Sequence, residues 1–128
     1  MCSSDLPAAA QQPAEATSYP ARSVKVVVPY SPGAAADIIG RLVAQKLSEL
    51  TGSQFYVENL PGAGGVIGTA TAARAPADGY TLLVMNQDFV VQPAVKSKVP
   101  YDPFKTFIPV ASIAAAPERF RSIPHSPR

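Results

Sequence analysis

Hydrophobic positions along the chain alternate between short β-branched runs and longer stretches with helical spacing. Residues 24–28 (VKVVV), which Pro29 ends, are typical of a strand buried on both faces. From Ala35 to Leu50 apolar residues recur at helical spacing, and Gly52 favours the end of a helix there. The same pattern predicts strands at 55–57, 80–85 and 107–114 and helices at 66–74 and 89–95. Because strands alternate with helices, we expect an α/β fold with a parallel sheet and flanking helices.

The two ends of the chain lack this periodicity. Residues 1–20 hold Ala, Gln, Ser and Pro, which cannot bury enough apolar surface to offset the entropy of ordering, so a disordered head is expected. Ala8 and Ala10 also fit a signal-peptide cleavage site, so the head is either a signal-peptide remnant without its apolar region or an Ala-rich linker. Residues 117–128 are interpreted as an aberrant tail, which leaves 21–116 as the folded part.

Length, charge and composition narrow the classes of function. A chain of 128 residues fits one domain, and no apolar run reaches the roughly 18 residues that a membrane span needs. A net charge of +2 without a Lys/Arg cluster argues against a nucleic-acid partner. The only Cys is Cys2 and the only His is His125, so the chain has no Cys/His set for a metal.

Ligands of open parallel sheets bind where strands end and helices begin. After the first strand, the small residues 33–36 (GAAA) let a ligand approach the start of a helix, whose N–H groups attract anions. After the third strand, Asn86, Gln87 and Asp88 supply polar groups that suit a small polar ligand. Neither loop contains Lys or Arg, so a bound carboxylate would depend on backbone groups and water.

Asp37 lies in the first turn of the predicted first helix, where a free carboxylate would repel an anion. It either contacts the ligand directly or has its oxygens occupied by N–H groups of the helix. We favour a role as helix cap.

The Gly-rich segment at residues 62–68 also resembles a nucleotide-binding turn at first sight. Gly62-Ala63-Gly64 would need a third glycine at position 67, where the chain has Ile67, and the glycines also suit close packing of a helix on the sheet. Ser31 lacks the glycine two positions earlier that a nucleophile elbow requires. We therefore expect no catalytic residues, no cofactor and no enzymatic activity. The alternative is an α/β enzyme domain that binds a nucleotide or an acyl anion.

Four motifs in order along the chain resemble the substrate-binding receptors of tripartite tricarboxylate transporters, the Bug-type periplasmic solute-binding proteins. The resemblance covers residues 19–116 and rests on residues 26–33 (VVVPYSPG) with Asp37, 57–65 (VENLPGAGG) with Gly68, 78–83 (DGYTLL), and 101–103 (YDP) with 107–110 (FIPV).

This resemblance implies a periplasmic-binding-protein-like (type 2) fold of which only part of lobe one is present. It also implies a periplasmic receptor that captures a small organic carboxylate and delivers it to the membrane permease subunits of the transporter. In such receptors the loops after the first and third strands line the cleft. Carried over to this sequence, the ligand-binding candidates are Ser31, Pro32, Gly33 and Ala34, with Asn86, Gln87 and Asp88 opposite.

The chain departs from the family pattern at three places. Ala34 replaces a usual glycine and disfavours positive φ, and Gln92 stands before Pro93 where Asn is usual. After Ala116 the expected hydrophobic strand gives way to a segment that includes Glu118 and Arg119. We therefore expect an N-terminal fragment of a receptor. The alternative is a non-functional truncated product. In either case the exposed strand edges should make the chain poorly soluble.

Overall fold

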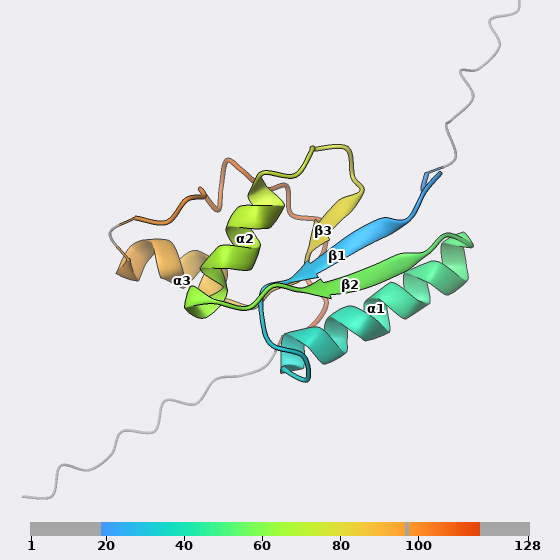
Figure 1. Ribbon diagram of the computed structural model, residues 1–128, viewed down its shortest axis with the longest axis horizontal. Coiled ribbons are helices and arrows are strands. Elements are labelled where there is room, and N and C mark those ends of the chain that lie inside the picture. Colours follow the sequence, from blue (N-terminus) through green and yellow to red (C-terminus); the bar gives the residue numbers. More distant parts are fainter. Residues whose placement is uncertain (1–18, 97, 116–128) are drawn as a thin grey trace, which may run out of the picture.

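The centre of the molecule is a three-stranded parallel sheet in a computed structural model that describes residues 19–96 and 98–115 (Figure 1). Its strands are β1 (Val24–Val28), β2 (Phe55–Asn59) and β3 (Thr81–Leu83), in the order β2-β1-β3. Val24 lies opposite Phe55 and Val28 opposite Asn59, while Lys25 lies opposite Thr81. The predicted parallel α/β sheet is therefore confirmed, although β2 is two residues longer than expected and β3 is shorter.

Helices connect the strands, and one more helix follows the last strand. They are α1 (Ala35–Thr51), the short 3-10 helix η1 (Ala63–Gly65), α2 (Val66–Ala73) and α3 (Asp88–Val95). Helix α1 packs on β1 and β2, whereas α2 packs on β1 and β3. Figure 1 shows α1 and α2 on opposite sides of the sheet, as right-handed crossovers with this strand order require.

The core is built on the valines of β1, which are at most 1% exposed. Val24 and Val26 pack with Ala44 of α1 and with Phe55 of β2. Lys25 is tolerated in this strand because its ammonium group reaches Glu58 of β2 at 2.8 Å, where both side chains meet solvent. The expectation of a first strand buried on both faces is confirmed.

Helix α2 lies unusually close to the end of β1. A Cβ atom added at Gly68 would stand 2.6 Å from the Leu60 carbonyl oxygen and 2.8 Å from the Pro29 Cα. No larger residue fits at this position without moving backbone. The expected role of glycine in close helix packing is thus confirmed at Gly68.

The predicted strand at 107–114 is wrong. The segment has no regular secondary structure, and Ile108 and Val110 are 88% and 85% exposed. Pro109 removes one N–H group, and no strand of the described part of the chain pairs with the segment. Hydrophobic residues alone do not form a strand without a partner to satisfy the backbone.

The described part of the chain begins with a segment held to the sheet. Tyr19 donates a hydrogen bond of 2.6 Å to the Gly79 carbonyl, and Arg22 pairs with Asp78 at 2.7 Å while lying over the Tyr80 ring. The rest of the predicted head and the predicted tail at 117–128 lie outside the described residues. None of the described helices is long and apolar enough to cross a membrane.

Candidate functional site

The order of the strands brings two loops together at the carboxyl edge of the sheet. Strand β1 continues through α1 to β2 on one side, while β3 lies on its other side, so the chain changes direction between β1 and β3. The loop at 29–34 follows β1, and the loop at 84–87 follows β3. Open α/β sheets bind ligands at such a switch point.

Tyr30 connects these two loops. Its hydroxyl donates a hydrogen bond to the Asn86 side-chain oxygen and lies 3.5 Å from an Asp88 carboxylate oxygen. The Asp88 backbone N–H donates to the same Asn86 oxygen at 3.0 Å. The structure therefore joins the two loops that contain the predicted ligand-binding residues, apart from Asp88, which begins α3 directly after the second loop.

The environment of Tyr30 keeps its hydroxyl protonated. Burial, and to a smaller extent the neighbouring Asp88 carboxylate, together raise the pKa of Tyr30 to about 12. At neutral pH the group is a hydrogen-bond donor and the link between the loops persists.

The first loop presents small, accessible residues. Ser31, Pro32 and Gly33 are exposed and Ala34 is half-buried. Gly33 has φ +86°, which glycine adopts without strain, whereas Ala34 has φ −67° and ψ 156°. The alanine that replaces a usual glycine at position 34 thus fits this loop without strain.

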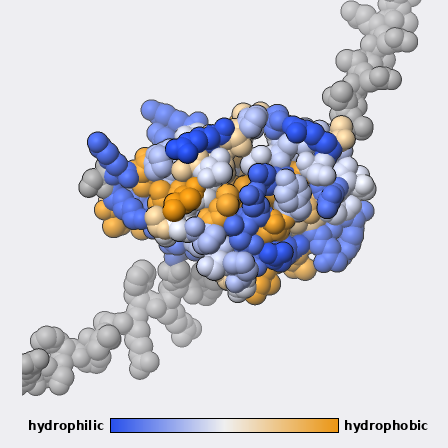
Figure 2. Space-filling model, in the orientation of Figure 1, coloured by the Kyte–Doolittle hydropathy of each residue, from blue (hydrophilic) through white to orange (hydrophobic). Residues whose placement is uncertain are grey.

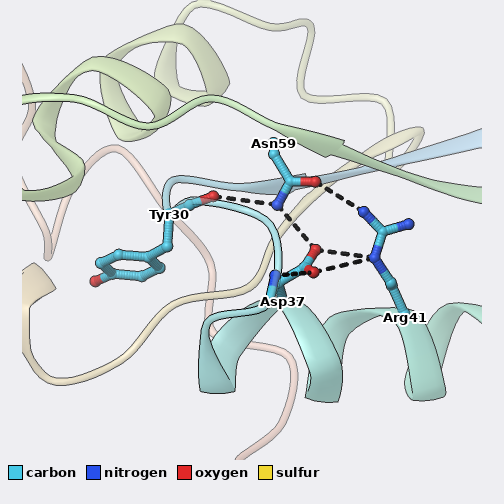
Figure 3. A network of polar contacts seen from close by, with 5 residues as sticks. Tyr30, Asp37, Arg41 and Asn59 are labelled. Atoms are coloured by element: carbon cyan, nitrogen blue, oxygen red, sulfur yellow. Dashed lines mark hydrogen bonds and ion pairs between the residues drawn. The ribbon is translucent and has the colours of Figure 1, made fainter.

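A buried polar network fixes the other side of the first loop (Figure 3). Asp37 is 3% exposed and accepts hydrogen bonds from the Gly33 N–H at 2.9 Å and the Asn59 side-chain amide at 2.8 Å, and it pairs with Arg41 at 3.1 Å. The Asn59 amide also donates to the Tyr30 carbonyl at 3.1 Å, and Arg41 donates to the Asn59 oxygen at 2.9 Å. The end of β2 and the first turn of α1 therefore hold the loop in place.

These contacts favour the ionised form of Asp37. The Gly33 N–H makes the largest contribution, followed by Asn59 and Arg41, and together they lower the pKa of Asp37 to about 2. Its charge is compensated inside the network.

The prediction that Asp37 caps α1 needs correction. The cap residue is Ala34, which makes no side-chain cap hydrogen bond, and Asp37 lies within the first turn. Its carboxylate instead accepts the N–H of Gly33, in the loop before the helix. The cap interpretation missed Asn59 and Arg41, which are the other partners of this carboxylate.

Sequence reasoning also missed Tyr30 and Asn59 as members of the site. Both lie at the carboxyl ends of their segments: Tyr30 two residues after β1, and Asn59 as the last residue of β2. The rule that polar residues at strand ends gather at one edge of a parallel sheet would have found them.

The Gly-rich turn before α2 is engaged with α3. Lys96 donates to the Ala63 carbonyl at 2.7 Å, and Gln92 donates to the Gly64 carbonyl at 3.3 Å. Residues 62–65 all have positive φ, including Ala63 at 51°. These contacts pack the turn against α3 and the residue that follows it.

Within residues 19–96 and 98–115 no group of three His, Cys, Asp or Glu residues could hold a metal ion.

Comparison with known proteins identifies similar chains. Residues 39–128 match the tripartite tricarboxylate transporter family receptor. The UPF0065 protein in the tcbD-tcbE intergenic region of Pseudomonas sp. (strain P51) is 39% identical over 114 residues, which cover 83% of this chain and 34% of that protein.

Solved structures agree in fold and sequence. The periplasmic binding protein BugD superposes with a TM-score of 0.67 and 39% identity over 70% of this chain and 30% of its own. MatC from Rhodopseudomonas palustris, solved with bound malate, gives a TM-score of 0.64 and 34% identity over 74% of this chain and 33% of its own. The chain thus spans about a third of the length of the proteins that it matches.

Proposed function

Because this chain belongs to the family of tripartite tricarboxylate transporter receptors, we propose that it supplies part of the cleft that binds a small organic carboxylate. It corresponds to about a third of a Bug-type receptor, so the ligand and the partners of the whole receptor are part of this proposal. The observation that carries it is the meeting of the loops after β1 and β3, bridged by Tyr30.

The first loop suits the carboxylate end of such a ligand. Ser31, Pro32 and Gly33 are exposed in front of α1, and the helix N-terminus carries partial positive charge. The N–H groups of Ala35 and Ala36 have no backbone or side-chain acceptor within residues 19–96 and 98–115. These two donors are available to a ligand, directly or through water.

A receptor explains this edge of the sheet better than an enzyme does. The matched family consists of receptors, and the neighbours BugD and MatC are a binding protein and a protein with bound malate. Among the described residues the switch point holds amide, hydroxyl and carboxylate groups but no nucleophile paired with a base. Family membership also supports a periplasmic location and delivery to the membrane permease subunits of the transporter.

The proposal is tested by titrating the full chain with small mono-, di- and tricarboxylates and following backbone amide shifts by NMR. We expect saturable shifts in residues 30–37 and 84–88, with dissociation constants in the millimolar range or below. The variant Gly33→Ala should weaken binding by about tenfold, because alanine disfavours φ +86° and displaces the loop.

Gly52→Ala is the matched control for this variant. Gly52 has φ +70° and, like Gly33, open space around an added Cβ, but it lies at the far end of α1. The same backbone strain should therefore leave affinity unchanged. A chain that binds no carboxylate, or that loses affinity equally in both variants, would contradict the proposed site.

A further inference from the structure

The two carboxylates beside the loops of the proposed cleft differ in whether a cationic side chain pairs with them. Asp37, behind the first loop, is compensated by Arg41 and by two amide donors. Asp88, at the start of α3 behind the second loop, forms no ion pair with any Lys or Arg of residues 19–96 and 98–115. Within the described ranges, the negative charge of Asp88 beside the second loop therefore has no cationic side chain paired with it.

The contacts of Tyr30 leave this carboxylate with unused acceptor capacity. The Tyr30 hydroxyl has one proton, which it donates to Asn86, and its separation of 3.5 Å from Asp88 is at the long limit of a hydrogen bond. Asn86 uses its oxygen on Tyr30 and on the Asp88 N–H. An ionised carboxylate offers about four acceptor sites, so Asp88 can accept further donors.

The position of Asp88 keeps its carboxylate accessible. It is half-buried and is the first residue of α3, where the helix dipole favours a negative side chain. A second carboxylate placed beside it would be repelled, whereas an ammonium or hydroxyl group would be attracted. The N-terminus of α1 therefore attracts a carboxylate at one end of a small ligand, whereas Asp88 attracts an ammonium or hydroxyl group at the other end.

Resting on the proposed function above, we propose that Asp88 accepts a hydrogen bond from a donor group carried by the ligand. The ligand class is then amino- or hydroxy-substituted carboxylates rather than unsubstituted ones. The carboxylate lies toward Gly33 and the first turn of α1, and the ammonium or hydroxyl group lies toward Asp88.

Three four-carbon diacids test this assignment: succinate, malate and aspartate share one skeleton and differ in a hydrogen, a hydroxyl and an ammonium group. Calorimetric or NMR titration of the full chain should show malate, aspartate or both binding about tenfold more tightly than succinate. In Asp88→Asn the preference should fall to about twofold or less, because the neutral amide is a weaker acceptor. Which of malate and aspartate binds more tightly distinguishes the hydroxyl from the ammonium as the donor.

Glu49→Gln is the matched control, since it removes one exposed negative charge far from the loops, where Glu49 pairs with Lys46. It should leave the preference unchanged. The readout is a ratio of affinities within one sample, so partial unfolding of a variant cancels. Succinate binding as tightly as malate and aspartate, or a preference that survives in Asp88→Asn, would overturn the role of Asp88 while carboxylate binding itself stands. If none of the three acids and no other carboxylate binds, the proposed function fails and this inference with it.

Discussion

Asp37 shows how a single buried carboxylate organises the candidate site. It joins three segments, because its partners are Gly33 before α1, Arg41 one turn further along α1, and Asn59 at the end of β2. Asn59 extends the network to the Tyr30 carbonyl, and the Tyr30 side chain extends it to Asn86. The position of the first loop therefore depends on residues that need not touch a ligand.

The lowered pKa of Asp37 predicts a specific acid sensitivity. In the folded chain its pKa is about 2, against 3.8 for an unperturbed Asp, so its contribution to stability is present above pH 4 and is lost as the pH falls from about 4 to 2. Urea unfolding between pH 6 and pH 2.5 should show the wild-type chain losing stability over this window. Asp37→Asn should have a lower free energy of unfolding than wild type at pH 6, and its free energy of unfolding should change less with pH below pH 4. If the free energies of unfolding of the two proteins change with pH in parallel, protonation of Asp37 is not coupled to folding.

At this scale the sequence indicates residue types but not their partners. Gly33, Asn86 and Asp88 are predicted from their places after strands and Ser31 from the family resemblance, and the structure brings their segments together. Their role in binding stays a prediction. Tyr30 and Asn86 are 56 positions apart, and their contact exists only because β1 and β3 are neighbours in the sheet. Such a contact follows from topology rather than from local pattern.

At the scale of elements, α2 and the end of β1 are held together by close contact across Gly68. In Gly68→Ala the new methyl would meet backbone atoms at 2.6 and 2.8 Å, which should destabilise the fold by about 1–3 kcal/mol despite the better helix propensity of alanine. Thermal or urea unfolding measures this loss.

Gly40→Ala, in α1, is the appropriate comparison. Its added methyl would meet a Val28 side-chain methyl at 3.1 Å, and a side chain yields more easily than backbone. We expect this variant to lie within about 1 kcal/mol of wild type, because helix propensity offsets the crowding. Equal destabilisation in both variants would mean that the contact of α2 with the Pro29 region is not specifically tight.

Element boundaries could be predicted where periodicity and a terminating residue agree. Strand β1 was predicted residue for residue, since Pro29 ends it, and α1 ends beside Gly52, which adopts φ +70°. The segment at 107–114 was not predictable in this way. Its apolar residues favour a strand, but a strand also needs a partner for its backbone, and local sequence carries no information on that partner.

For the molecule as a whole, much of the exposed apolar surface of the described residues lies on α3 and the segment after it. A shallow apolar groove of about 500 Å³ lies between α3 and residues 101–104, and Val95, Phe104, Ile108 and Val110 are all at least 75% exposed. Figure 2 shows hydrophobic surface over α3, at the left of the view, and near the start of α1. The chain spans about a third of its relatives' length, and exposed apolar patches of this kind favour association with other protein surfaces.

This surface should cause the chain to self-associate. Replacing Ile108 and Val110 by Lys should shift the chain toward monomer and raise its solubility several-fold, because the two side chains make up exposed apolar area in one extended segment. Size-exclusion chromatography with light scattering checks this. Lys46→Ala with Gln45→Ala, on the exposed polar face of α1, is the control and should not reduce association. A wild-type chain that is monomeric at high concentration would contradict the expectation.

The central place of β1 has a consequence for the order of events during synthesis. Of the three described strands, the first to be synthesised is the one that the other two flank, and 56 residues separate Val27 from its partner Leu83. At about 5–20 residues per second this delay is about 3–11 s. Throughout that time the most hydrophobic of the described strands has at most one neighbour, so residues 24–28 of the nascent chain stay exposed and available to a chaperone.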